Sequence, residues 1–378
     1  MAGLYVHIPF CKSRCIYCGF FSTTSSEMSS RYVDCLCSEL SMRGHDYARP
    51  WTTVYLGGGT PSTLPAPELR RLFGHIDCSH AVEVTIECNP DDVDADFGSL
   101  LATLPVNRVS MGVQSFDDRR LSFLRRRHSA SDVLRAVNVL RSAGIDNISI
   151  DLIYGFPGET LDDWDNDITA ALALNVEHIS AYCLTYEEDT PLYRMLHNGT
   201  VKETDEETCR TMYYHLRSRL MAAGYEHYEL SNFALPGRRA VHNSNYWNLT
   251  PYLGIGASAH SYDGMVRCWN VASLPLYINK VEKGDLPIDD YEGLTLKEQY
   301  NDMVMVRLRT SEGISLNDVS SRFDHSFLAH LLSLAKPYMD LGLLELTSNN
   351  GNPPKRHLRL SEDALYVCDM ITADLFRL

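Results

Sequence analysis

The sequence predicts an α/β fold, an incomplete (β/α)6 barrel of the TIM type followed by a small C-terminal helical or winged domain. Short apolar, β-branched runs typical of buried strands alternate six times with stretches of helical spacing. This alternation implies parallel strands joined by right-handed crossovers. Past about residue 285 the pattern changes to helices and one strand pair, which indicates a separate unit.

The strand and helix predictions follow the chain in order. The six buried strands are expected at residues 4–8, 53–56, 82–86, 108–113, 148–153 and 178–184. Helical spacing occupies residues 31–42, 67–75, 131–143 and 161–174, and Gly144 is a stop signal for the third of these.

The second half of the chain has weaker signals. A longer helix is expected at residues 205–224 and a strand at 225–230, and Pro236 begins a section that we expect to be rich in loops. A strand pair is expected at 343–347 and 357–360, with a polar turn at 348–355. The predicted divisions are residues 1–200 for the partial barrel, 201–290 for an extension of it, and 291–378 for the small C-terminal domain.

Composition and charge exclude several classes of protein. The net charge is −15 and the Lys and Arg residues are dispersed, so the sequence shows no surface for a phosphate backbone, and we expect no nucleic-acid partner. Residues 1–10 lack the pattern of a signal peptide, and no later window is long and apolar enough for a membrane span. These features indicate a soluble, cytoplasmic protein.

Three of the 11 cysteines lie close together directly after the first predicted strand. They stand in the segment Tyr5-Val-His-Ile-Pro-Phe-Cys11-Lys-Ser-Arg-Cys15-Ile-Tyr-Cys18. A barrel carries its functional groups at the C-terminal ends of its strands, so this loop lies where an active site is expected. The remaining cysteines are scattered without ligand spacing, which favours ordinary buried thiols.

Three thiolates suit an iron–sulfur cluster. A cubane cluster usually takes four cysteines, so a loop that offers Cys11, Cys15 and Cys18 leaves one iron free for another ligand. S-adenosylmethionine can chelate that iron through its amino and carboxylate groups. The alternative is a zinc site with His7 or Cys88 as the fourth ligand, and the cysteine loop alone leaves it open.

Glycine and polar residues follow the next predicted strands. Residues 57–59 are three glycines, which let a ligand approach the backbone without a β-carbon in the way. The third, fourth and fifth strands end at Glu87, Gln114 and Asp151. Each feature alone is typical of an ordinary turn or strand end. Together they offer partners for the amine and ribose of an adenosyl cofactor, and an arginine of residues 125–127 could pair with its carboxylate.

These motifs carry a family resemblance. The chain resembles the oxygen-independent coproporphyrinogen III oxidase family of radical S-adenosylmethionine (radical SAM) proteins over nearly its whole length. Besides the cysteine loop, the matching segments are Gly-Gly-Gly-Thr-Pro-Ser, Glu-Cys-Asn-Pro, Ser-Met-Gly-Val-Gln-Ser-Phe, Asp-Leu-Ile-Tyr-Gly-Phe-Pro-Gly-Glu-Thr and Tyr-Leu-Gly-Ile-Gly-Ala. The resemblance implies a radical SAM barrel, a cubane 4Fe-4S cluster on the three cysteines, and the small C-terminal domain of that family.

The resemblance also implies contacts to S-adenosylmethionine. The residues that match are Tyr5, Gly58, Gly59, Thr60, Glu87, Gln114, Arg126 and Asp151. Arg126 is chosen among the three arginines because it stands twelve residues after Gln114, as in the family. The family usually has glycine before this arginine, and here that residue is Arg125.

Two features separate the chain from the oxidases within the family. Oxidases have a fourth cysteine two positions after the third, and here that position is Phe20. The segment His242-Asn-Ser-Asn-Tyr246-Trp247 matches a signature of the heme-chaperone branch. Proteins of that branch are understood to bind heme and deliver it to membrane-bound hemoproteins while retaining the cluster and S-adenosylmethionine.

Two functions therefore stay open. One is a heme-binding delivery protein, and the other is a radical enzyme that acts on a tetrapyrrole, so the sequence does not decide whether the chain is an enzyme. Phe20 and the His242 motif favour delivery.

The heme motif allows two roles for His242. It could be a ligand of heme iron, with Tyr246 and Trp247 as stacking surface, or the three residues could pack a loop over the barrel. Arg238 and Arg239 lie just before the motif, and we expect them to pair with heme propionates, with plain surface solvation as the alternative.

Overall fold

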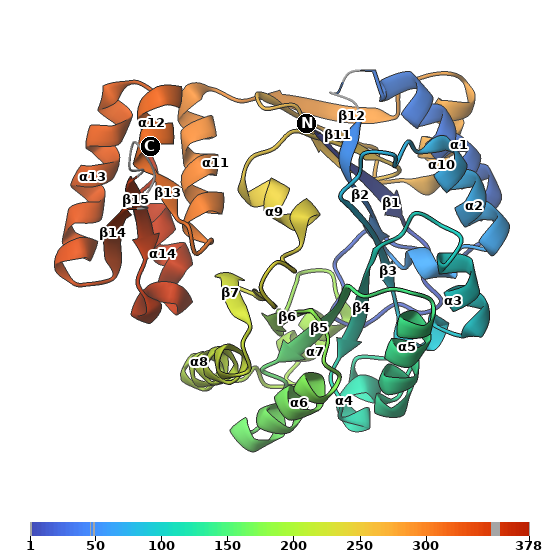
Figure 1. The fold of residues 1–378 in the computed structure, drawn as a ribbon, viewed down its shortest axis with the longest axis horizontal. Helices are drawn as coiled ribbons and strands as arrows, with labels where there is room; N and C mark the ends of the chain where they lie inside the picture. The colour runs from blue at the N-terminus through green and yellow to red at the C-terminus, as the bar shows by residue number, and fades with distance from the viewer. Residues whose placement is uncertain (1, 46, 48–49, 349–355, 378) are drawn as a thin grey trace.

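A computed structural model of the chain describes residues 2–45, 47, 50–348 and 356–377 (Figure 1). Its largest element is a 12-stranded sheet with the strand order β12-β11-β10-β9-β1-β2-β3-β4-β5-β6-β8-β7. Strands β1 to β6 are neighbours in chain order and pair in parallel. They are β1 (Ala2–Ile8), β2 (Trp51–Gly58), β3 (Glu83–Cys88), β4 (Arg108–Gln114), β5 (Ile148–Tyr154) and β6 (His178–Cys183).

Helices connect these strands, and most of them cover the outer face of the curved sheet (Figure 1). They are α1 (Ser29–Arg43), α2 (Ala66–His75), α3 (Ala95–Leu101), α4 (Asp118–Phe123), α5 (Ala130–Ser142), α6 (Leu161–Ala173), α7 (Pro191–His197) and α8 (Glu206–Ala222). Helix α7 instead packs through Leu192 on Ile16 of the cysteine loop. The six predicted strands and the five predicted helices of this region are confirmed, with small differences at their ends. The short helices α3, α4 and α7 were not predicted, because six or seven residues give too few turns for a clear apolar period.

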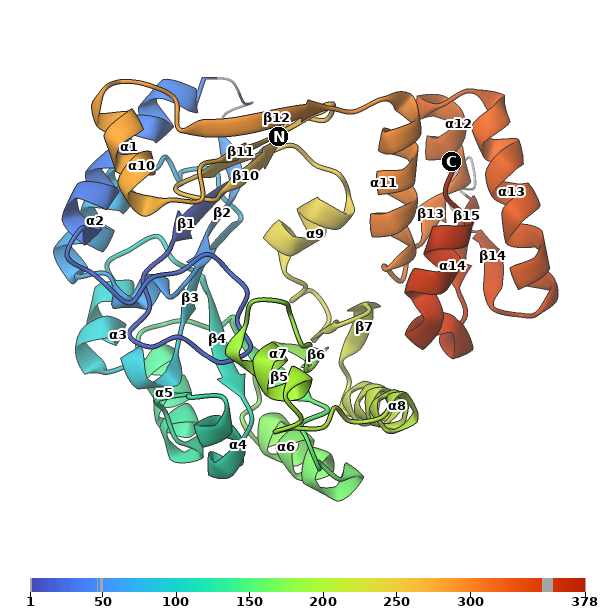
Figure 2. The same cartoon turned by 180° about the vertical axis from the view of Figure 1, so that it is seen from behind.

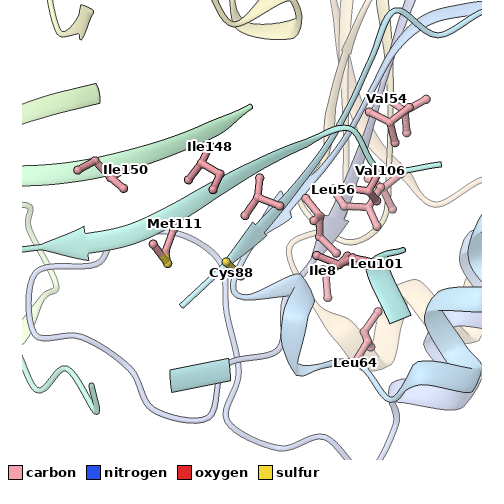
Figure 3. Packing of buried hydrophobic residues seen from close by; sticks show 14 of the residues in the cluster. Ile8, Val54, Leu56, Leu64, Cys88, Leu101, Val106, Met111, Ile148 and Ile150 are labelled. Atoms are coloured by element: carbon pink, nitrogen blue, oxygen red, sulfur yellow. The ribbon is translucent and has the colours of Figure 1, made fainter. Parts of the chain in front are cut away.

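The alternation of side chains along the parallel strands produces the main core. Val54 and Leu56 of β2, Met111 of β4, and Ile148 and Ile150 of β5 are fully buried on the side that faces the helices (Figure 3). The intervening residues point to the inner side of the sheet, where the polar groups gather. Burial on both sides explains why these strands appear in the sequence as nearly continuous apolar runs.

Residues 226–293 extend the sheet at both edges. The hairpin β7 (Glu226–Glu229) and β8 (Asn232–Ala234) adds to β6, while β9 (Tyr252–Ile255) pairs in parallel with β1. The strands β10 (His260–Tyr262), β11 (Val266–Asn270) and β12 (Ile288–Gly293) continue that edge, and α10 (Leu274–Glu282) lies beside α1. The prediction of a loop-rich section was therefore wrong. Strands of three to six residues with polar and glycine positions carry too little periodicity to be recognised.

The His242 motif falls within the section that was expected to be rich in loops. The motif forms the short helix α9 (Val241–Trp247), which contacts both β2 and the C-terminal helix α11 (Leu296–Leu308). In both views α9 lies between the large sheet and the C-terminal unit (Figures 1 and 2).

The C-terminal unit has a core of its own. Besides α11 it contains α12 (Leu316–Arg322), α13 (His325–Asp340) and α14 (Cys368–Asp374) around a small antiparallel sheet of β13 (Ile314–Ser315), β15 (Arg356–Leu360) and β14 (Leu344–Ser348). The predicted strand pair is confirmed as β14 and β15, and β13 is an unpredicted third strand. Residues 349–355 of the predicted turn lie outside the described residues. No helix within the described ranges is both long and apolar enough to span a membrane.

Candidate functional site

The cysteine loop and the C-terminal ends of the parallel strands surround one cavity of about 190 Å³. All three cysteines of the loop line it. Seven of the eight residues predicted to contact S-adenosylmethionine line it as well, namely Gly58, Gly59, Thr60, Glu87, Gln114, Arg126 and Asp151. The eighth, Tyr5, is not among the lining residues: its hydroxyl lies 3.1 Å from His7 Nδ1, and its ring stacks on Tyr55.

The three thiols are partly exposed to this cavity. Burial raises the pKa of Cys11 and of Cys18. Two donors contact the sulfur atoms: Thr60 Oγ1 is 3.6 Å from Cys11 Sγ, and Arg126 Nη1 is 3.6 Å from Cys15 Sγ. Donors of this kind favour the thiolate form that binds iron.

The donor set fits a cubane cluster. Each cysteine of such a cluster binds a different iron, so the three sulfurs need not converge on a single point. Within the part of the chain that the structure describes, no three His, Cys, Asp or Glu side chains are placed to hold one metal ion. Cys11, Cys15 and Cys18 would hold three irons, and the fourth would face the cavity.

Backbone hydrogen bonds dock the start of the cysteine loop on the glycine turn after β2. The amide of Gly59 donates to the carbonyl of Ile8 at 2.8 Å, and the amide of Thr60 donates to that of Phe10 at 2.8 Å. A β-carbon at Gly59 would lie only 2.8 Å from the carbonyl carbon of Pro9. The glycine is therefore required by the close approach of the two loops.

Glu87 fixes the same turn from the end of β3. Its carboxylate accepts hydrogen bonds from the Tyr55 hydroxyl at 2.7 Å and from the Gly58 amide at 3.1 Å. Burial raises the pKa of Glu87 to about 7 and that of Asp151 to about 6. Both carboxyl groups therefore hold protons near neutral pH more readily than exposed acids do, and an amine or a hydroxyl of a ligand could stabilise their charged forms.

Arg126 is held against the cavity by Cys15, Asn89 and Gly112, which lie on three segments of the chain. Its Nη2 donates to Asn89 Oδ1 at 2.5 Å and also to the carbonyl of Gly112, while its buried Nε has no partner among the described residues. The sequence did not single out Asn89, although it lies in the Glu-Cys-Asn-Pro segment and lines the cavity. An unpaired donor beside the cavity suits a ligand carboxylate.

Arg125 occupies the position where the family usually has glycine. Its φ is +60°, which lies in the left-handed region that glycine favours. The amide of Arg126 donates to the carbonyl of Leu121 at 2.8 Å, and that of Arg125 to Ser122 at 3.0 Å, so the pair closes α4 in the manner of a glycine C-cap. The glycine-type backbone is thus kept without the glycine.

The heme motif lies apart from the cysteine cavity. His242 is 1% exposed, its Nδ1 lies 2.9 Å from Thr53 Oγ1, and its Nε2 lies 2.9 Å from the Tyr246 hydroxyl. Burial, followed by the charge of Arg108, lowers the pKa of His242 to about 3. In this conformation both ring nitrogens are engaged. The guanidinium carbon of Arg309 lies over the Trp247 ring, 5.6 Å from the centre of that ring.

The two arginines before the motif are paired with acids. Arg238 Nη2 lies 3.4 Å from Asp146 Oδ2. Arg239 donates to Glu226 at 3.0 Å and to Glu312 at 2.6 Å. A propionate at either arginine would have to displace these carboxylates.

A second, larger cavity of about 850 Å³ adjoins the first on the inner side of the sheet. The two share Cys18, Glu87, Gln114 and Asp151, so a molecule in one would lie beside a molecule in the other. Phe20 lines both cavities and is 70% exposed. Nothing in the sequence indicates this second cavity, because its walls include Asn243 of α9 and Asp369 of the C-terminal unit as well as the sheet.

Two family models match the chain. The Radical SAM superfamily model matches residues 5–171, and the HemN C-terminal domain model matches residues 294–364. Among solved structures, coproporphyrinogen III oxidase (HemN) from Escherichia coli has the same fold, with a TM-score of 0.84 over 99% of this chain and 90% of that one, at 22% sequence identity.

The curated relatives are more similar in sequence. The heme chaperone HemW of Bacillus subtilis is 34% identical over 351 residues, which cover 91% of this chain and 93% of that protein. The heme chaperone HemW of Lactococcus lactis is 34% identical over 85% of each chain. With this identity over almost the full length of both proteins, and with the radical SAM fold, the chain belongs to the HemW family of radical SAM proteins.

Proposed function

We propose that this protein carries a 4Fe-4S cluster and S-adenosylmethionine, binds heme, and delivers the heme to hemoproteins. The observation that carries the proposal is the nearly full-length similarity to proteins named heme chaperone HemW. Phe20, which stands in place of the fourth cysteine of the oxidases, supports it. The acceptors would be hemoproteins, membrane-bound ones included, and nucleic acid has no part in the proposed function.

The cysteine cavity supports the cofactor part of the proposal. Cys11, Cys15 and Cys18 would hold the cluster, and Arg126 would take the carboxylate of S-adenosylmethionine with its free Nε. Glu87 would receive the amine or ribose side of the ligand while it keeps the glycine turn in place. When bound, the two cofactors supply one-electron chemistry. This chain would use that chemistry rarely, or only to regulate heme delivery.

Heme binding by the His242 motif requires a change in the described conformation. His242 can reach heme iron only if its ring leaves Thr53 and Tyr246, which hold both nitrogens in the described conformation. Release of the ring requires α9 to move away from β2, which also breaks the hydrogen bond that Asn245 donates to Thr53. Tyr246 and Trp247 would then offer stacking surface to the porphyrin.

We also propose the architecture that places these sites. Strands β1 to β6 would form an incomplete (β/α)6 barrel, with residues 201–290 as its extension and residues 291–378 as a winged domain. The parallel order of the six strands and the separate core of the C-terminal unit support this division. We further propose that the protein works in the cytoplasm.

A radical enzyme acting on a tetrapyrrole is the second candidate. The observation that favours it is the 850 Å³ cavity, which shares Gln114 and Asp151 with the cofactor cavity and would bring a substrate next to S-adenosylmethionine.

One experiment separates the two functions. Anaerobically reconstituted protein is titrated with hemin, and in parallel it is incubated with coproporphyrinogen III, S-adenosylmethionine and dithionite, followed by product analysis. We expect saturable hemin binding, transfer of heme to an apo-hemoprotein, and no decarboxylated product above a control without protein. Repeated turnover of coproporphyrinogen III would contradict heme delivery and support the enzyme.

A further inference from the structure

Arg108, the first residue of β4, is a buried cation with unpaired donors. It is 1% exposed, and its Nε and Nη1 have no hydrogen-bond partner among the described residues. A buried guanidinium without an anion is strongly disfavoured. Arg43 of α1 shows the usual arrangement of a buried arginine, since its Nη1 donates to Glu39 at 2.8 Å and its Nη2 to Ser261 at 3.0 Å.

Arg108 faces the large cavity and not the core. Val109 and Met111 of β4 are fully buried against the helices, while Arg108, Ser110 and Gln114 line the 850 Å³ cavity. A strand advances by about 3.3 Å per residue, so the arginine lies roughly 20 Å along β4 from the cofactor end at Gln114. Arg108 therefore lies on the side of the cavity away from the cysteine loop, two residues before Ser110, which pairs with Glu87 in the sheet.

The groups near this end are poor counterions for Arg108. The imidazoles of His178 and His242 lie within reach of the charge of Arg108, but an imidazole can carry no negative charge. The carboxylate of Glu83 already accepts hydrogen bonds from the amides of Val241 and His242, at 2.7 and 2.8 Å. The charge of Arg108 also reaches the carboxyl groups of Glu87 and Asp151, but its Nε and Nη1 have no hydrogen-bond partner among the described residues and stay available for an anion from outside.

We propose that this end of the cavity is a carboxylate-binding subsite in which Arg108 receives a propionate of the bound heme. The inference rests on the proposed function and deepens it by naming the residue that recognises the acidic edge of the porphyrin. A guanidinium presents its donors in a fork that matches a carboxylate. Tyr55, Tyr154 and Tyr182, together with Ile153, give the same cavity the apolar and aromatic walls that a flat macrocycle needs.

The position of Arg108 also fits the heme motif. Asn243 of α9 lines the same cavity, and its neighbour His242 is the predicted iron ligand. One porphyrin could then contact α9 through its iron and Arg108 through its acidic edge. Arg239, by contrast, is already held by Glu226 and Glu312.

The test is a comparison of two ligands and three proteins. Wild type, Arg108→Gln and Arg239→Gln, all reconstituted anaerobically as full chains, are titrated with hemin and with hemin dimethyl ester, whose propionates carry no charge. Thermal unfolding of each protein without ligand is measured alongside. Arg239→Gln is the matched control, because it removes a paired arginine close to the same motif.

We expect wild type to bind hemin about 10- to 100-fold more tightly than the ester, as one charge-assisted contact would give. Arg108→Gln should lose this preference and Arg239→Gln should keep it. Because Nε and Nη1 of Arg108 have no hydrogen-bond partner to lose among the described residues, Arg108→Gln should melt no lower than wild type.

Other outcomes overturn the inference in distinguishable ways. If wild type binds hemin but does not prefer it to the ester, or if Arg108→Gln keeps the preference, the subsite is wrong while heme binding stands. If Arg108→Gln unfolds at a clearly lower temperature and weakens both ligands equally, Arg108 is a structural residue. If wild type binds no hemin at all, the proposed function fails together with the inference.

Discussion

Substitution of Gly59 by alanine probes the contact between the glycine turn and the cysteine loop. An ideal β-carbon at this position would lie 2.8 Å from the carbonyl carbon of Pro9, 2.9 Å from the Pro9 oxygen and 2.9 Å from the Phe10 oxygen. All three atoms belong to the backbone, so no side chain can rotate to make room. The loop that carries Cys11 must therefore move away from β2, or the turn must deform.

The expected cost follows from this overlap. Overpacking of a tight site costs about 1–3 kcal/mol of stability. In the Gly59→Ala variant, the hydrogen bonds that the amides of Gly59 and Thr60 donate to Ile8 and Phe10 would be strained as well. Gly74 in α2 provides the control, since nothing lies within 4 Å of its ideal β-carbon. Alanine at this helical position should raise the free energy of unfolding by about 0.5–1 kcal/mol.

The assay combines urea unfolding, followed by circular dichroism, with iron analysis after anaerobic reconstitution. We predict that Gly59→Ala lowers both the free energy of unfolding and the amount of iron bound per chain. Gly74→Ala should raise the free energy of unfolding and leave the iron content unchanged. If Gly59→Ala matched wild type in both stability and iron content, the cysteine loop would not depend on this close approach.

Two further predictions concern Arg125 and His128, which are close neighbours of Arg126 in the chain. Arg125→Gly should raise the free energy of unfolding by about 1 kcal/mol, because glycine accepts the left-handed φ of +60° without strain, and an unchanged urea midpoint would contradict this. Burial lowers the pKa of His128 to about 4, so the unfolded chain, with a pKa near 6.5, binds the proton first as the pH falls. Wild type should therefore lose about 3 kcal/mol relative to His128→Asn between about pH 6.5 and 4, and parallel stability curves for the two proteins would refute this.

Much of the fold could be predicted because the six parallel strands are buried on both faces. Residues such as Leu56 and Ile150 appear within continuous apolar runs, and the helices between them have a clear period. The cofactor residues could be predicted for a related reason. The C-terminal ends of parallel strands meet at one edge, so Glu87 and Gln114 had to lie close to the loop after β1. Asp151 was expected at a strand end too, but it lies in the middle of β5 and reaches the cavity from the inner side of the sheet.

The inner side of the sheet could not be predicted in the same way. In the sequence, Arg108 is only a charged residue at the start of a strand. Tyr228 of β7 and His242 of α9, which lie near it in the fold, come more than 100 residues later. The setting of His242 depends on Thr53 of a distant strand for the same reason. A motif indicates which side chains matter, while long-range packing decides which of their atoms are free.

The central claim is that Cys11, Cys15 and Cys18 hold a cubane cluster with one iron open to S-adenosylmethionine. The most direct test is anaerobic reconstitution followed by iron and sulfide analysis and by electron paramagnetic resonance of the reduced protein with and without S-adenosylmethionine. We predict about four irons and four sulfides per chain and a spectrum that changes when the cofactor is added. One tetrahedral zinc per chain, with no inorganic sulfide and no affinity for S-adenosylmethionine, would contradict the claim.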